Sequence, residues 1–117
     1  MNANASQGLL SRQWSDYGRV HRDRRNLLLH LVTAPIFAAS SVAVVLAPWT
    51  HLWLAPLGLA LMLLVVALQG GGHKLEGAAP APFRDRLDIV LRIVAEQWIT
   101  FPRYVLSGAF FRAIRQA

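Results

Sequence analysis

Three histidines and one glutamate give this 117-residue sequence its clearest candidate for chemistry. His21 precedes a long apolar run, and His30 lies early within that run. His73 directly follows a second apolar run. Glu76 lies three residues after His73, which places both on one helical face or in one tight turn. Imidazole and carboxylate ligands without a thiolate suit iron(II), zinc, manganese or nickel, and such sets with open positions occur in non-haem iron oxygenases. The three histidines are therefore candidate metal ligands.

The spacing of the histidines limits how they can meet. Nine residues separate His21 from His30, which puts them about 180° apart on a straight helix. If both bind one ion, the chain must bend between them, or His21 must lie outside the helix. Asn26 and Gln69 are placed to accept the second N–H group of a ligating imidazole. The fourth histidine, His51, lies beside two tryptophans, and we interpret it as a membrane-interface residue.

The element that must bring these residues together is a charge-free block. The 48 residues between Arg25 and Lys74 contain no Asp, Glu, Lys or Arg. Charged residues make up 15% of the chain, against roughly 25% in ordinary soluble domains. This argues against a soluble globular enzyme and a disordered chain, and the absence of cysteine argues against a disulfide-stabilised secreted module. The block divides at residues 48–51 into two runs, about 27–47 and 52–69, each approaching the roughly 20 residues of a membrane-spanning helix.

We therefore expect an all-α membrane protein whose two apolar runs form a transmembrane helical hairpin. An antiparallel hairpin that turns near residue 50 brings residue 30 level with residue 70, and His30 close to His73. The alternative is a two-helix core inside a soluble oligomer.

The distribution of charge predicts the orientation. Five arginines precede the hairpin, seven Lys or Arg follow it, and its connecting loop has none. The positive-inside rule then places both termini in the cytoplasm. The basic residues that give the chain its net charge of +6 flank an apolar block. We therefore expect anionic membrane lipids as partners and no nucleic acid.

Beyond the hairpin we expect two further helices in a single domain, residues 1–117, which begins with a polar segment, 1–20. The glycines at 70–72 are expected to end the second arm, and residues 77–82 to form a non-helical link. An amphipathic helix is predicted at about 84–101, and a short helix at about 103–115, with Pro102 between them. The amphipathic helix has a narrow polar stripe formed by Asp85, Asp88, Arg92, Glu96 and Arg103. This stripe faces either headgroups and solvent or a polar bundle interior.

Two motifs resemble those of a small membrane-protein family. His21-Arg-Asp-Arg-Arg-Asn-Leu-Leu-Leu-His30, with Pro35 beyond it, resembles the first, and Gln69-Gly-Gly-Gly-His-Lys-Leu-Glu76 resembles the second. The family is that of the fungal 2-hydroxy fatty acid dioxygenases (MPO-like), long known as a domain of unknown function. The resemblance covers roughly residues 14–105. Thr33 departs from it, because the family usually has a glycine there.

The resemblance implies an iron(II) enzyme of an endoplasmic-reticulum-type or bacterial inner membrane. The implied reaction uses dioxygen to shorten a long-chain 2-hydroxy fatty acid by one carbon. His21, His30 and His73 would be the ligands, and Glu76 a fourth ligand or a catalytic base. Among the basic residues near the hairpin, Arg25 and Lys74 are expected to attract the substrate carboxylate.

Other functions fit the same residues. His30 and His73 could be axial ligands of a haem between the arms, or the histidines could hold zinc in a hydrolase. The chain could also be a non-enzymatic membrane adaptor whose histidines only form hydrogen bonds. A homo-oligomer is compatible with each.

Overall fold

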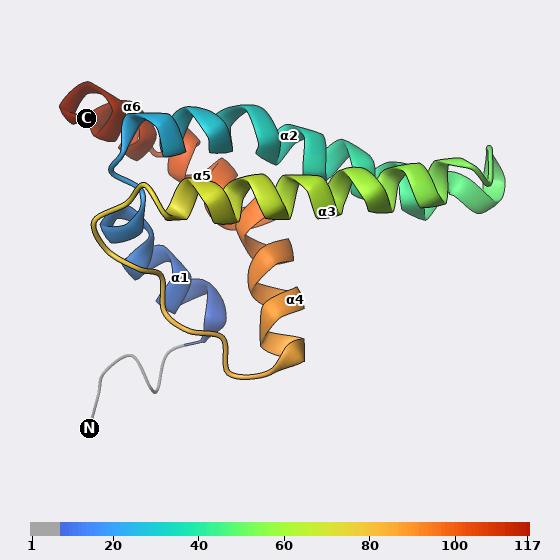
Figure 1. Ribbon diagram of the computed structural model, residues 1–117, viewed down its shortest axis with the longest axis horizontal. Coiled ribbons are helices and arrows are strands. Elements are labelled where there is room, and N and C mark those ends of the chain that lie inside the picture. Colours follow the sequence, from blue (N-terminus) through green and yellow to red (C-terminus); the bar gives the residue numbers. More distant parts are fainter. Residues whose placement is uncertain (1–7) are drawn as a thin grey trace.

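All the regular secondary structure in residues 8–117, the part that the computed structural model describes, is helical, and this part contains no strand (Figure 1). Of the expected polar segment 1–20, residues 1–7 lie outside the described residues. The rest is not simply a polar lead-in, because Leu9–Tyr17 forms helix α1, followed by a 3₁₀ turn, Gly18–Val20. This helix is amphipathic and buries Tyr17 at its end.

The predicted helical hairpin is confirmed. Helices α2 (Arg24–Leu46) and α3 (Leu54–His73) run antiparallel and side by side, joined at one end by the 3₁₀ turn Ala47–Trp49 (Figure 1). Helix α2 begins at Arg24 because the Asp23 side chain accepts the free N–H of Arg25 at 2.8 Å.

The glycines at 70–72 do not end the second arm, as the sequence had suggested, because α3 continues through them to His73. A β-carbon on Gly72 would collide with the Asn26 side chain and lie 2.8 Å from Leu29 Cδ2. Glycine at this position therefore lets the two helices approach closely, and this packing outweighs the low helix propensity of glycine. The extra turn carries His73 on the helix itself.

The chain after the hairpin crosses back beneath it. The expected non-helical link at 77–82 is part of a longer one, residues 74–85. It leads into α4 (Arg86–Ala95), which runs roughly across the hairpin direction (Figure 1). A π-helical turn, Glu96–Thr100, continues α4 directly into α5 (Phe101–Leu106). Pro102 therefore does not interrupt the helix as predicted. Proline lacks an N–H donor and crowds the preceding turn, and the wider π turn just before it accommodates this.

The predicted C-terminal helix at 103–115 is divided in two. Gly108 adopts a φ of +85°, a left-handed conformation that ends α5 and precedes α6 (Ala109–Gln116). Around this point the last helices pack against α1 and the start of α2 in a small core of Tyr17, Leu27, Ala34, Phe101, Tyr104 and Phe110.

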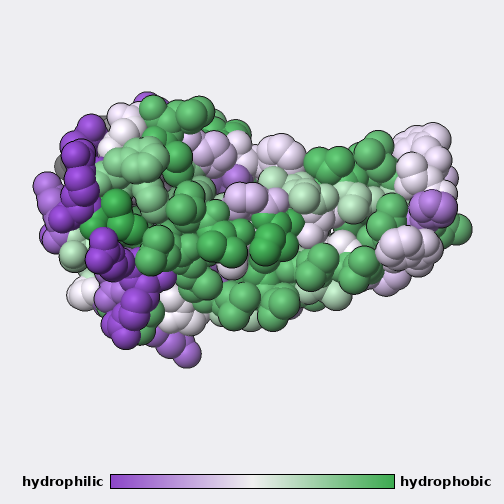
Figure 2. All heavy atoms as spheres, turned by 90° about the horizontal axis from the view of Figure 1, so that it is seen from above, coloured by the Kyte–Doolittle hydropathy of each residue, from purple (hydrophilic) through white to green (hydrophobic). Residues whose placement is uncertain are grey.

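Apolar side chains cover most of the hairpin surface. The stretch Arg24–Trp49, which includes α2, and helix α3 are long and apolar enough to cross a membrane. Only 28% of the most apolar part of the first and 17% of that of α3 are buried in the protein. A core helix of a soluble protein would be mostly buried. In the face seen in Figure 2, hydrophobic residues cover the hairpin, and strongly hydrophilic residues gather at the end opposite its turn.

Candidate metal centre

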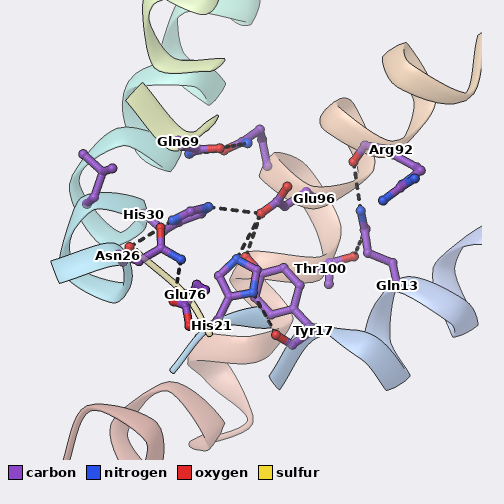
Figure 3. A network of polar contacts seen from close by, with 12 residues as sticks. Gln13, Tyr17, His21, Asn26, His30, Gln69, Glu76, Arg92, Glu96 and Thr100 are labelled. Carbon is purple, nitrogen blue, oxygen red and sulfur yellow. Dashed lines mark hydrogen bonds and ion pairs between the residues drawn. The ribbon is translucent and has the colours of Figure 1, made fainter. Parts of the chain in front are cut away.

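The described residues contain one cluster of side chains that could hold a metal ion. His21, His30, His73 and Glu96 each offer one ligand atom, and these atoms all lie within 4.8 Å of one another. Ligands at about 2.0–2.2 Å from one ion lie roughly 3–4.4 Å apart, so the cluster is close to the required size. It lies at the open end of the hairpin, where α2, α3, the π turn and the segment before α2 meet (Figure 3).

His21 reaches the cluster because it lies outside the helix. It follows the 3₁₀ turn with φ −133° and ψ 69°, three residues before α2 begins. His30 is one turn into α2, and the bend between them removes the 180° separation that a straight helix would impose. Of the two arrangements that the spacing allowed, the structure has the one with His21 outside the helix.

Backbone carbonyl groups fix two of the imidazoles. Nδ1 of His21 lies 2.8 Å from the carbonyl oxygen of Tyr17, and Nδ1 of His30 lies 2.9 Å from that of Asn26. A carbonyl can only accept, so each Nδ1 must carry the proton and each Nε2 has a free lone pair when the ring is neutral. Both Nε2 atoms are buried without a hydrogen-bond partner, as is Nδ1 of His73. Buried, unpaired ring nitrogens aimed at one point are the arrangement that a metal ion would complete.

Ring packing holds the imidazoles in these orientations. Tyr17 stacks on His21 with ring centroids 3.8 Å apart and an interplanar angle of 14°. The three imidazoles are mutually edge-on, with centroid separations of 4.7, 4.9 and 5.2 Å. His21 is 2% exposed and His30 is fully buried.

Glu96 supplies the carboxylate of the cluster. Its Oε1 lies 3.3 Å from His30 Nε2 and 3.5 Å from His21 Nε2, and it accepts the Tyr17 hydroxyl at 3.1 Å (Figure 3). Burial alone would raise the pKa of this carboxyl, but the two imidazoles, when they are protonated, outweigh burial and hold this pKa well below its ordinary value. Burial and the nearby Glu96 charge raise the pKa of Tyr17, so its hydroxyl remains a donor.

Glu76 lies outside the metal-sized cluster. Its carboxylate accepts the backbone N–H groups of Arg22 at 2.8 Å and Asp23 at 3.0 Å, and the Asn26 side-chain amide at 2.7 Å. These groups lie in the bend between His21 and His30. Glu76 therefore ties the chain after His73 to the segment that places the other two histidines.

Asn26 and Gln69 also contact the site differently from what the spacing predicted. Asn26 does lie beside His30, but its backbone carbonyl, not its side chain, accepts the imidazole N–H. The Gln69 side chain contacts no imidazole: it exchanges hydrogen bonds with Gln97 and donates to the Thr33 hydroxyl at 2.9 Å. Thr33, which departs from the family pattern, is thus part of a buried polar network just above the histidines.

The two basic residues expected near the substrate carboxylate lie in different surroundings. Arg25 is directed toward Asp23, 3.3 Å away, and its side chain is largely exposed. Lys74 lines a cavity beside the cluster. His51 is exposed near the turn of the hairpin, at the end opposite the other three histidines, and stacks on Trp53.

Two cavities adjoin the cluster. The first, about 470 Å³, lies between α1, the link and α4, and the second, about 720 Å³, lies between α3, the link and α4. His73 and Glu96 line both. Volumes of about 300–1,000 Å³ are typical of small-molecule sites, so a ligand could reach the cluster from either side.

Sequence reasoning missed Glu96 as a member of the cluster. The sequence identified Glu96 only as part of the polar stripe, for which it left open two orientations, toward headgroups and solvent or toward a bundle interior. In the structure Glu96 faces the bundle interior. The available signal was a carboxylate in an otherwise mostly apolar stretch of that helix, six residues before Pro102. The π turn beginning at Glu96 could not be read from spacing, and such turns often occur at functional sites.

The donor set fits a divalent transition metal. Three neutral imidazoles and one ionised carboxylate suit iron(II), manganese or zinc, and fewer than six protein ligands leave positions for other molecules. A haem between His30 and His73 fits poorly, because a third imidazole and a carboxylate approach the same point.

Comparison with known proteins agrees with the sequence motifs. No curated protein and no solved structure matched the chain. A protein-family model described as 2-hydroxy-palmitic acid dioxygenase Mpo1-like matches residues 9–101, which include all four residues of the cluster. The chain therefore belongs to the Mpo1-like family.

Proposed function

We propose that this protein is an iron(II)-dependent dioxygenase of a membrane that shortens long-chain 2-hydroxy fatty acids by one carbon. The observation that carries the proposal is the buried set of three imidazoles and one carboxylate, with unpaired ring nitrogens directed at one another. The family name supports the substrate and the use of dioxygen.

In this proposal His21, His30, His73 and Glu96 hold the metal. Bound there, iron(II) supplies open positions and the redox chemistry that lets dioxygen react with a 2-hydroxy acid. The protein side chains keep the ligands ready: carbonyl groups of Tyr17 and Asn26 hold the imidazole protons away from the metal position. The Tyr17 hydroxyl steadies the Glu96 carboxylate by donating to Oε1.

The overall reaction balances with dioxygen as the sole oxidant. The bond between the carboxyl carbon and the hydroxyl-bearing carbon breaks, and the hydroxyl-bearing carbon becomes the carboxyl group of the shorter acid. The original carboxyl group leaves as carbon dioxide. These two carbons lose four electrons in total, which reduce dioxygen, and one water is formed.

Other side chains would support the substrate and the site. Lys74 is better placed than Arg25 to attract the substrate carboxylate, because it lines a cavity that reaches His73 and Glu96. We assign Glu76 a positioning role instead of a catalytic one, since its carboxylate is taken up by the backbone before α2 and by Asn26.

The proposal places the hairpin across a membrane with both termini in the cytoplasm, in a bacterial inner membrane or one of endoplasmic-reticulum type. The exposed apolar surfaces of α2 and α3 support this. The metal cluster then lies at the cytoplasmic boundary, with Trp49 and Trp53 at the opposite interface. Such a position suits an amphiphile whose head is in water and whose chain is in lipid.

The test is oxygen uptake by detergent-purified, iron-loaded protein given 2-hydroxyhexadecanoic acid. We expect uptake together with the acid one carbon shorter, and loss of both in a His73→Ala variant. Zinc-loaded protein serves as a control that has the same ligands but no redox chemistry. Protein that holds iron at one ion per chain and produces no shortened acid would overturn the proposal for this substrate.

A further inference from the structure

The larger of the two cavities has a mostly apolar lining. It is about 720 Å³ in volume, and its walls include Val66 and Gly70 of α3, Phe83 of the link, and Ile89 and Ile93 of α4. One end of it reaches His73 and Glu96. An apolar space that leads to a polar cluster suits a ligand with a chain at one end and a reactive head at the other.

The smaller cavity has a more polar lining, which includes the carboxylates of Asp16, Asp88 and Glu96. Its lining contains four arginines, of which Arg19 pairs with Asp16 and Arg92 with Asp88. Among residues 8–117, Arg12 has no such partner, and its buried Nε has no hydrogen-bond acceptor there. The two cavities share His73, Glu96 and Arg92. A mostly apolar compartment and an arginine-rich one thus meet at the candidate metal ligands, and Arg12 and Lys74, unpaired within the described residues, offer positive charge to an anionic amphiphile.

The surface around the larger cavity is also apolar. Leu63, one turn before Val66 on α3, is 71% exposed, and Leu87, just before Ile89 on α4, is 65% exposed. Helix α4 runs roughly across the hairpin (Figure 1). With the hairpin across a bilayer, α4 would lie along the membrane plane and the cavity beside α3 would adjoin the hydrocarbon.

Gly70 is where a side chain would enter this space. A β-carbon on Gly70 would meet no atom within 4 Å, and Gly70 lines the larger cavity. Gly71 also has open space within 4 Å, but it lines neither cavity. The two glycines are neighbours in one helix, but a side chain introduced at Gly70 would enter the larger cavity, whereas one introduced at Gly71 would enter neither cavity.

From these observations we infer that the cavity between α3 and α4 binds the alkyl chain of the substrate, entering from the bilayer, and that Gly70 keeps this cavity open. The inference rests on the proposed function for the identity of the head group. It commits to one occupant, a single unbranched chain attached to a 2-hydroxy carboxylate. A permanently bound lipid chain is the alternative that the test distinguishes.

The experiment compares Gly70→Leu with Gly71→Leu in lipid nanodiscs, with cobalt(II) in place of iron so that no turnover occurs. Binding of 2-hydroxyhexadecanoic and 2-hydroxyhexanoic acids is followed by the visible spectrum of cobalt. Gly70→Leu should weaken binding of the long acid by about tenfold or more, because several methylenes lose their apolar contacts. It should leave the short acid and cobalt affinity nearly unchanged, and Gly71→Leu should resemble the unaltered protein.

Equal weakening of both acids, or unchanged binding of the long acid, overturns the inference, and so does a lipid chain that copurifies with the protein and that the long acid does not displace. If Gly70→Leu fails to bind cobalt, Ile93→Phe fills the same cavity from α4 and replaces it. The outcomes are separable from the proposed function. If the protein distinguishes the long acid from the short one but has no dioxygenase activity, the alkyl-chain cavity is supported and the proposed reaction is wrong. If Gly70→Leu and Ile93→Phe leave dioxygenase activity unchanged, the reaction is supported and the cavity assignment is wrong.

Discussion

The Nε2 atom of His30 lies 3.3 Å from the Oε1 atom of Glu96, which joins the start of the hairpin to the π turn. The His30 ring is anchored through Nδ1, which leaves Nε2 directed at Glu96, while Oε1 of Glu96 also accepts the Tyr17 hydroxyl at 3.1 Å. Protonated at Nε2, His30 would form an ion pair with Glu96. Neutral, it directs a lone pair at the carboxylate, and an ion between the two residues would complete that arrangement.

Replacing Glu96 should therefore affect metal binding more than replacing Glu76. We expect Glu96→Gln to lower the affinity for cobalt(II) or zinc by about 100-fold or more, because it removes a charged ligand, whereas loss of a supporting group costs about 10–100-fold. Glu76→Gln, the same chemical change, should stay within about tenfold, since its amide oxygen still accepts N–H groups. Isothermal titration of both variants measures this. The reverse ranking would mean that Glu76 is the ligand.

The close approach of the helices at Gly72 predicts opposite effects for two neighbouring substitutions. Gly72→Ala should destabilise the protein by about 1–3 kcal/mol, because its β-carbon collides with Asn26 and Leu29. Gly71→Ala should stabilise it by about 0.5–1 kcal/mol, because alanine favours the helix and meets no neighbour. Thermal unfolding in detergent measures both. A stable Gly72→Ala protein would show that the hairpin packs less tightly there.

The hairpin was predictable from sequence because it depends on a property of long stretches. A 48-residue block without charge can form few other structures, and its turn at residues 48–51 sets the levels of His30 and His73. The end of α3 was not predictable, because the behaviour of Gly72 depends on Asn26 in another helix.

The candidate site was predictable only where its residues belong to one hairpin. Glu96 enters from a later helix, and its direction depends on the π turn that accompanies Pro102. Local spacing favoured Glu76 instead, because it lies near His73 in the sequence. The position of His21 depended on whether the chain bends before α2, which spacing left open and the contacts of Glu76 with Arg22 and Asp23 now explain.

The buried amide pair above the histidines should behave as a unit. Gln97→Leu leaves the Gln69 amide without one of its partners and should cost about 1–3 kcal/mol of stability, whereas replacing both glutamines by leucine should cost less than the sum of the single changes. Metal affinity should stay nearly constant in all three variants, because neither amide contacts an imidazole. A loss of metal binding confined to Gln69→Leu would instead restore Gln69 as a partner of the ligands.

The proposed membrane placement leads to a labelling pattern that the cysteine-free sequence makes simple to measure. With both termini cytoplasmic, Thr50→Cys at the hairpin turn should react with a membrane-impermeant maleimide only from the non-cytoplasmic side. Arg115→Cys in α6 should react only from the cytoplasmic side. Leu63→Cys, 71% exposed on α3, should react from neither, because a thiol in hydrocarbon does not ionise and the reagent does not enter. Labelling of Leu63→Cys as fast as Thr50→Cys would place α3 in water and favour a soluble oligomer.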